Sequence, residues 1–493
     1  MLSKRIIILL LATIAILGGC ALWGPNYQEP DVKADPSWVS TDDLSKVDKS
    51  NESADVTLLA KMKWWEQFND PVLNKLVVYT LAHNPTIQQQ IGNIMQAQAN
   101  LRSVEMGWVP TLSFMPGYRA TGTYTGVAGA GATAYTIGGN AGYFIDFLPS
   151  YSINIMQQLR QVEAAKAGLS LAQYQKDAMR MTIIGQVAGS YLSLRGYDYI
   201  LVIQKELAVD TAKQYELGKA QFKEGYISLL TLQNYQQQYE TAQAQVPITQ
   251  NNIVATRNAI RVLANKNPGD MARGPDFEQI PTDGLIPVNL PSTVLRARPD
   301  IRQMESALVQ ANANIGVATS TFFPTLNLTG NTGWAANGLS TLFNAGSDFW
   351  QTQISATMPW LNLAAVAQID TVRGLYYQAY WNYINTVRTA FQQVDSGLSG
   401  HDKLTKSYKD MIEVYKSSVT AYNLEDGRYK QGLDSLMPVL QYKIQMEQAA
   451  LNLASSKTNQ LQTIVTLYQA LAAGYDVGNT EKPNTVFGDM RDF

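Results

Sequence analysis

Apolar or weakly apolar residues recur at every seventh position along a stretch without proline, which runs between Pro149 and Pro247. Seven residues is the period of a seam between supercoiled helices. The positions between are too polar for a clean second apolar row, so this helix should pack side by side against neighbours while water reaches its other faces. The pattern predicts one helix from Tyr151 to Glu224, about 110 Å long. The seam residues are Val187, Leu194, Leu201, Ala208, Tyr215 and Phe222.

A second pattern predicts β-strands. Residues 117–142 contain eight glycines and a single charge, Arg119, a composition that no helix tolerates. Four segments alternate imperfectly and have about the ~9–11 residues that a tilted membrane strand needs. Bacterial membrane barrels generally need at least eight strands and cannot expose an edge to lipid, so the hairpins are either soluble decorations or are pooled by several chains into one barrel. The predicted strands are Thr111–Thr121, Ala134–Phe147, Thr325–Ala335 and Phe349–Pro359.

The chain contains two copies of one unit. Residues 85–114 match residues 299–328 without a gap, at an offset of 214, and Phe222–Leu229 matches Tyr429–Leu436 at an offset of 207. The first copy therefore carries seven extra residues between about 115 and 185. Each copy should contain a helix, a β-hairpin and a long helical hairpin, which predicts an α+β fold with internal pseudo-symmetry. The predicted divisions are a signal peptide at 1–19, an N-terminal lipidated and equatorial segment at 20–71, repeats at 72–285 and 286–475, and a C-terminal tail at 476–493.

The N-terminus reads as a secretory signal, with Lys4 and Arg5 followed by an apolar run and then by Gly18, Gly19 and Cys20. The apolar run reaches only ~18 Å, short of the ~30 Å hydrocarbon layer, so we expect it to be cleaved rather than to span a membrane. Its ending resembles the bacterial lipobox, which implies that Cys20 is acylated. Ala21 follows in place of the aspartate associated with inner-membrane retention, which favours an outer-membrane destination.

Composition excludes several classes of protein. The chain has 493 residues, of which 46% are hydrophobic and 16% charged, with a formal net charge of −2. It is too apolar for wholesale disorder and shows no basic excess for nucleic acid. One cysteine and two histidines cannot supply a zinc cluster or an intrachain disulfide. Because no nucleophile elbow or phosphate loop stands out either, we expect no enzyme activity, no metal and no cofactor.

Two glycines predict tight turns between helices. Gly225 and Gly432 can relieve a left-handed residue at the end of one helix, and Ser228 and Ser435, three positions later, can cap the next. Pro247 interrupts an otherwise helical stretch and should kink or end it.

Charged residues crowd the second of these turns. The carboxylates of Glu425, Asp426 and Asp434 lie close in sequence to Arg428. We hypothesise a charged constriction in which ion pairs favour closure and their loss favours opening. For each residue the alternative is a solvated helix end without a gating role.

Two further groups have structural interpretations. Trp64, Trp65 and Phe68 could form a belt between protomers, although such aromatics are more often simply core. Arg298 and Asp300 should fix the start of the helix that follows them.

Taken together, these motifs resemble the TolC-like outer-membrane efflux family, in the lipoprotein branch that serves resistance-nodulation-division drug pumps. The chain departs from the family pattern at Leu148–Ser150, where a glycine-containing turn is common, and at Met304, where a small residue is usual. The carriers of the resemblance are Cys20 with Gly24-Pro25-Asn26-Tyr27 and Pro30, Trp64-Trp65 with Phe68 and Asp70-Pro71, Arg298-Pro299-Asp300-Ile301, Phe322-Phe323-Pro324 with Leu326 and Leu328-Thr329-Gly330, and the two Gly-x-x-Ser turns.

The resemblance implies a homotrimer whose three sets of four strands form one outer-membrane β-barrel, continued into the periplasm by a barrel of long helices. It also implies that the turns at 225–228 and 432–435 lie at the periplasmic end, where they meet the adaptor (membrane fusion) protein of an inner-membrane pump. The expected function is passive conduction of drugs and small molecules by a lipid-anchored channel.

The same sequence features leave other functions open. A TolC-like exit duct for protein secretion would share the same architecture, and a structural periplasmic coiled-coil lipoprotein or adaptor would share the helices but not the paired hairpins. A secreted hydrolase with cleft carboxylates is a third class.

Overall fold

The computed structural model describes residues 24–30, 56–120, 125–126, 135–136, 141–282, 292–359 and 361–478. The chain forms two compact units. The sheet unit comprises Met1–Pro30, Met95–Leu171 and Glu305–Asn382, and the helical unit comprises Asp31–Ile94, Ala172–Met304 and Tyr383–Phe493. Cys20 and the predicted signal peptide lie outside the described residues.

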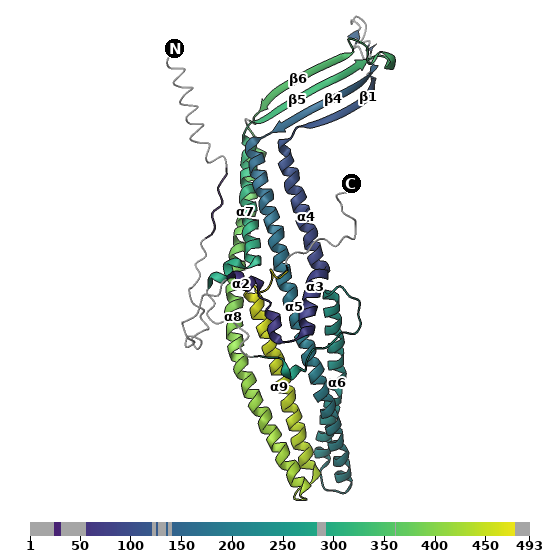
Figure 1. Cartoon of the computed structure of the whole chain (residues 1–493), viewed down its shortest axis with the longest axis vertical. Coiled ribbons are helices and arrows are strands. Elements are labelled where there is room, and N and C mark those ends of the chain that lie inside the picture. Colours follow the sequence, from purple (N-terminus) through teal and green to yellow (C-terminus); the bar gives the residue numbers. More distant parts are fainter. Residues whose placement is uncertain are drawn as a thin grey trace. The chain divides into compact units, whose positions relative to one another are not determined.

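The sheet unit contains one antiparallel sheet of four strands in the order β1-β4-β5-β6 (Figure 1). The register pairs Thr111 with Ser150 and Thr325 with Thr357. Two short strands, β2 (Thr125–Gly126) and β3 (Tyr135–Thr136), pair separately. The four main strands are β1 (Thr111–Ala120), β4 (Ala141–Ile153), β5 (Thr325–Ala336) and β6 (Asp348–Thr357).

The second strand differs from the sequence prediction. It was expected at Ala134–Phe147, but β4 runs on through the Leu148–Ser150 segment to Ile153. Pro149 pairs with Leu112 of β1, and a Cβ on Gly330 of β5 would lie 2.8 Å from the Pro149 ring, so the glycine makes room for the proline.

The first long helix consequently starts later than predicted. Helix α5 covers Ile155–Lys223, 69 residues, instead of beginning at Tyr151. Asn154 fixes this start because its side-chain oxygen accepts a hydrogen bond from Gln157 N at 3.1 Å and its amide donates to the Ser320 carbonyl at 2.8 Å.

The helices show the duplication directly. Helices α4 (Pro85–Glu105) and α7 (Pro299–Thr319) each have 21 residues, and α6 (Leu229–Leu263) and α9 (Leu436–Ala470) each have 35. Helix α8 (Leu363–Lys430) has 68 residues, one fewer than α5. The extra residues of the first copy therefore lie almost entirely in its β-hairpin.

Pro247 lies inside α6, so the helix does not end there. The shorter described elements are α2 (Val56–Lys61), α3 (Pro71–His83), and the 3-10 helices η3 (Trp64–Phe68), η4 (Met106–Trp108), η5 (Phe277–Gln279), η6 (Ser292–Ala297), η7 (Ser320–Phe322) and η8 (Leu339–Thr341).

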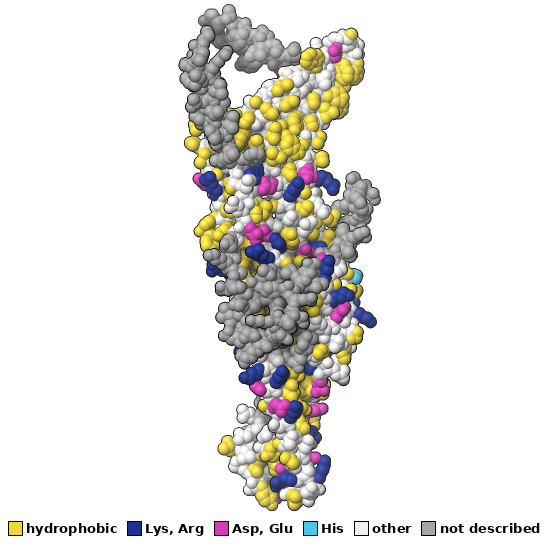
Figure 2. Space-filling view, turned by 60° about the vertical axis from the view of Figure 1, so that its left-hand side comes forward, with side chains coloured by type: hydrophobic (Ala, Val, Ile, Leu, Met, Phe, Trp, Pro, Cys, Tyr) yellow, Lys and Arg dark blue, Asp and Glu magenta, His cyan; other side chains and the backbone are white. Residues whose placement is uncertain are grey.

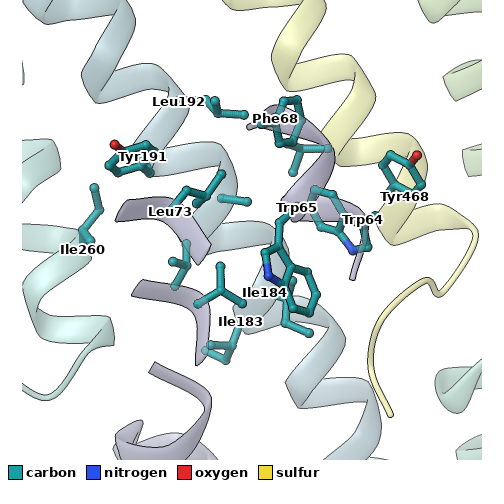
Figure 3. Close-up of a cluster of buried hydrophobic side chains, with 14 of the residues drawn as sticks. Trp64, Trp65, Phe68, Leu73, Ile183, Ile184, Tyr191, Leu192, Ile260 and Tyr468 are labelled. Carbon is teal, nitrogen blue, oxygen red and sulfur yellow. The ribbon is translucent and has the colours of Figure 1, made fainter. Parts of the chain in front are cut away.

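The core of the helical unit gathers around the aromatic residues of η3. Trp64, Trp65 and Phe68 are at most 1% exposed and pack with side chains of α3, α5, α6 and α9 (Figure 3). Arg298 forms a bidentate pair with Asp300, and its guanidinium also donates to the Ala470 carbonyl. These residues hold the helices together within the unit.

Candidate functional site

The register of the sheet sorts its side chains into two chemically different faces. Residues that pair across the strands share a face, and the face that carries Leu112 and Trp350 also carries most of the other large exposed apolar residues of the sheet. Hydrophobic side chains accordingly gather over the sheet in Figure 2. The exposed apolar residues of this face are Leu112, Phe114, Tyr118, Tyr143, Leu326, Leu328, Trp350 and Ile354.

The opposite face is mostly polar. It carries hydroxyl and amide side chains on all four strands, with few apolar exceptions such as Met115 and Phe144. One apolar and one polar face is the arrangement of a membrane barrel wall, which meets lipid outside and water inside. The polar residues of this face include Thr111, Ser113, Ser150, Ser152, Asn327, Thr329, Asn331, Gln351, Gln353 and Ser355.

The sheet has two unpaired edges among the described residues. Among the described residues β1 and β6 form its two edges, and each pairs with one neighbour only. The strands alternate in direction, so β6 of one copy can pair antiparallel with β1 of another. Such edges cannot remain unpaired in lipid, because the backbone groups would have no hydrogen-bond partners there.

Residues Gly24 to Asn26, which follow the predicted lipobox, are docked on the sheet unit. Asn312 donates to the Pro25 carbonyl at 2.8 Å, and the Arg160 guanidinium lies 3.3 Å from Asn26 Oδ1. Gly24 has φ +82°, and a Cβ there would lie 2.7 Å from Gly316 Cα, so only glycine fits this contact.

The two turns between long helices have the same backbone geometry. After α5, the amide of Gly225 donates to Phe222 O and that of Tyr226 to Gln221 O; after α8, the amide of Gly432 donates to Tyr429 O and that of Leu433 to Arg428 O. This paired pattern closes a helix around a left-handed residue, and the φ angles of the two glycines are +79° and +73°.

The serines of the two turns differ. Ser228 Oγ accepts a hydrogen bond from Thr231 N at 3.2 Å, as expected for a cap. Ser435 occupies the same position before α9, but its side chain makes no capping hydrogen bond. Asp434 Oδ1 instead accepts from the Ser435 amide at 2.8 Å. The expectation of a serine side-chain cap was therefore wrong for the second turn.

The candidate gate residues form two separate pairings. Arg428 Nη2 lies 3.2 Å from Asp434 Oδ2 and its Nε lies 3.7 Å from Glu425 Oε2. Asp426 instead pairs with Lys430, with 2.6 Å between Nζ and Oδ2. Sequence reasoning missed Lys430, although its i,i+4 spacing from Asp426 on a helix signals such a pair.

Electrostatics within this group are uneven. Burial and the adjacent Asp434 raise the pKa of Glu425. The Ser435 amide lowers the pKa of Asp434, and Arg428 adds to this effect. The Glu425 carboxyl is thus easier to protonate than that of Asp434.

No helix of the described part of the chain combines the length and apolarity needed to cross a lipid bilayer. The described residues also contain no cluster of three or more His, Cys, Asp or Glu side chains that could hold a metal ion.

The sequence matches the family model described as outer membrane efflux protein over residues 76–266 and 290–473. The chain belongs to this family. The two matched segments correspond to the two repeats, and the protein is an outer membrane component of an efflux system.

Individual relatives agree with the assignment. The chain is 29% identical to the toluene efflux pump outer membrane protein TtgF of Pseudomonas putida, over 94% of this chain and 96% of the relative. It is 26% identical to the antibiotic efflux pump outer membrane protein ArpC of P. putida, over 94% and 95% of the two chains. The open state of the MtrE outer membrane channel of Neisseria gonorrhoeae has the same fold, with a TM-score of 0.77 at 24% identity over 92% of this chain and 98% of that one.

Proposed function

We propose that this efflux protein is a homotrimeric channel that conducts drugs, solvents and other small, largely apolar molecules out of a pump assembly. The observation that carries the proposal is the two-faced sheet with two open edges. Three copies would supply twelve alternating strands, enough to close a barrel, and the apolar faces would meet lipid while the polar faces line water. The names of the relatives favour small apolar cargo over export of whole proteins.

Assembly and transport are tested together. Native mass spectrometry of the purified protein in detergent should give three copies, and planar bilayers containing it should show ion conductance. Deletion of its gene should sensitise the host to solvents and antibiotics, and complementation should restore resistance. A monomer without conductance, or a deletion strain impaired only in protein secretion, would contradict the proposal.

Cys20 is proposed to carry the lipid anchor. Gly24, only four residues after Cys20, is docked on the sheet unit, so a lipid on Cys20 would be joined by a short stretch of chain to the unit that carries the apolar sheet face. Intact mass of the mature protein should show acylation, and Cys20→Ser should abolish it. An unmodified wild-type Cys20 would refute the anchor.

The two turns are proposed to contact a periplasmic adaptor of an inner-membrane pump. Both expose apolar side chains to water, with Leu230 73% and Leu433 67% exposed. Leu230→Glu and Leu433→Glu should reduce co-purification of a periplasmic adaptor that is co-expressed with this protein in its host. The control Leu339→Glu changes an equally exposed leucine of the sheet unit and should leave it unchanged.

The ion pairs of Arg428, and the separate pair of Asp426 with Lys430, are proposed to favour a closed channel. Asp426→Ala, Arg428→Ala and Asp434→Ala should raise conductance in planar bilayers, because each removes one side of an ion pair in a narrow ring. Arg373→Ala removes an exposed pair with Asp370 elsewhere on α8 and is the matched control. Unchanged currents in all three variants would dispose of the gate.

A further inference from the structure

Two carboxyl groups are buried together between α5 and α9 within the helical unit. Asp210 of α5 and Glu447 of α9 are each only 2% exposed. Lys443 of α9 contacts Asp210 with 2.5 Å between Nζ and Oδ2, and Lys213 of α5 lies 2.9 Å from the other oxygen. Asp210 is therefore fully paired, whereas Glu447 is not.

The two oxygens of Glu447 receive no hydrogen bond from any donor among the described residues. The Lys443 Nζ lies 3.9 Å from Glu447 Oε1, and its close contact goes to Asp210. An ionised carboxylate without donors is strongly disfavoured in such a place. A protonated carboxyl is compatible with it, because its O–H can donate to Asp210.

Titratable groups of three helices surround the pair. They are Glu206, Asp210 and Lys213 of α5, Lys443 of α9 and Tyr422 of α8. Burial and the neighbouring Asp210 raise the pKa of Glu447 to about 8, against the opposing effect of Lys443. Burial would raise the pKa of Asp210 too, but hydrogen bonds from Lys443 and Lys213 lower it.

We propose that the α5–α9 contact is a proton-controlled latch, in which protonated Glu447 binds Asp210 and loss of its proton loosens α9 from α5. A hollow of about 710 Å³ lies between α5, α6 and α9, and residues adjacent in sequence to both carboxyl groups line it, although Asp210 and Glu447 themselves do not. Leu207 and Thr211 line it on one side, and Gln448 and Leu451 on another.

Loosening of α9 from α5 would also affect the turn that connects α8 to α9. Helix α9 begins at Leu436, about three helical turns before Glu447, and the preceding residues Asp434 and Ser435 belong to that turn. Loss of the Glu447 proton under alkaline conditions could therefore loosen this turn, although no residue of the turn itself changes its charge.

The direction of the pH effect follows from the proton balance. The closed contact keeps its proton up to about pH 8, whereas a solvated glutamate loses it near pH 4.5. Between these values opening releases one proton, so opening becomes more favourable as the pH rises, by up to about tenfold per pH unit.

Hydrogen exchange of the full-length protein in detergent tests the latch without requiring transport, so its result is independent of the proposed channel function. Exchange of α9 peptides covering residues 440–450 is compared between wild type and Glu447→Gln at pH 6, 7 and 8, which cancels the intrinsic pH dependence of exchange. The amide keeps the hydrogen bond to Asp210 but cannot ionise. We expect exchange in wild type to rise relative to this variant by up to about tenfold per pH unit.

Two more variants complete the test. Glu216→Gln removes an exposed carboxylate of α5 that pairs with Lys219, and it should behave as wild type. Asp210→Asn removes the negative charge beside Glu447, so the rise in α9 exchange with pH, the transition, should occur at lower pH than in wild type. This variant provides a test even where Glu447→Gln does not assemble. A constant ratio of wild type to Glu447→Gln across this pH range, or an unshifted transition in Asp210→Asn, would overturn the latch.

Discussion

Trp64 stacks on Tyr468, with ring centroids 4.9 Å apart and an interplanar angle of 12°. The Trp64 indole N–H also donates to the Ala473 carbonyl at 3.2 Å. This contact joins residues about 400 positions apart and attaches the segment before the first repeat to the end of the second.

Loss of this contact should destabilise the helical unit. Trp64→Ala removes a fully buried indole and its hydrogen bond, and we expect a loss of about 3–5 kcal/mol in the free energy of unfolding. Tyr468→Phe keeps the stacked ring and removes only the hydroxyl bonded to Gln67, so its cost should be about 1 kcal/mol. Chemical denaturation in detergent measures both, and equal losses in the two variants would contradict this role of the stack.

Asp70 and Tyr191 should be energetically coupled. Asp70 caps α3 by accepting from the Val72 and Leu73 amides, and it also accepts from the Tyr191 hydroxyl at 2.7 Å. Tyr191→Phe should cost about 1 kcal/mol, whereas Asp70→Ala also removes the cap and should cost about 2–3 kcal/mol.

The double variant provides the check on this coupling. Because Tyr191→Phe has already removed one of the hydrogen bonds to Asp70, the double variant should lose less stability than the sum of the single variants. Additive losses in denaturation experiments would show that the buried hydrogen bond contributes nothing.

Substitution of the two turn glycines by alanine should destabilise the protein, whereas the same substitution of a helical glycine should stabilise it. Gly225→Ala and Gly432→Ala place a Cβ at a left-handed residue, which should cost about 1–2 kcal/mol each. Gly427→Ala lies within α8 with open space around the new Cβ and should stabilise by about 0.5–1 kcal/mol. Thermal unfolding followed by circular dichroism compares the three, and stabilisation by all of them would refute the left-handed turns.

Lys457 should make stability rise under alkaline conditions. It is 5% exposed and donates to the Glu278 carbonyl at 2.7 Å, and burial lowers its pKa to about 8. Between pH 8 and 10.5 the unfolded chain keeps the proton that the folded chain has lost, so folding gains as pH rises through this window.

Denaturation at pH 7 and pH 9.5 measures this effect. Relative to Lys457→Met, wild type should become more stable at the higher pH. Lys219→Met changes an exposed lysine of α5, and the difference in unfolding free energy between it and wild type should be the same at both pH values. A difference between wild type and Lys457→Met that stays constant from pH 7 to 9.5 would contradict the prediction.

Local patterns predicted the long elements well. The absence of proline and the seven-residue repeat predicted α5 to within a few residues, because a helix depends mainly on short-range sequence. The β-hairpin of the first repeat was harder. Its second strand was placed too early because the glycine-rich sequence permits several registers, and pairing with β1 and β5 decides among them.

The candidate site was predicted unevenly for the same reason. Gly225 and Gly432 are local signals, since a left-handed helix end favours glycine in any context. The partner of Asp426, Lys430, lies four residues later on the same helix and was open to prediction from its spacing. The hydrogen bond from the Ser435 amide to Asp434 depends on the backbone conformation of the turn. The pairing of Asp210 with Lys443 joins two helices more than 200 residues apart, and no spacing in the sequence announces it.

By itself the sequence determined the duplication, the alternation of helices and hairpins and the position of each turn, because these depend on periodicity and on residues with special backbone freedom. Only the tertiary structure decided that the imperfectly alternating strands form one apolar and one polar face, because faces are defined by pairing between strands and not by any strand alone. It also decided which charges are buried, since burial is a property of packed helices. The two-faced sheet and the proposed latch between α5 and α9 both depend on contacts between segments that are distant in the sequence.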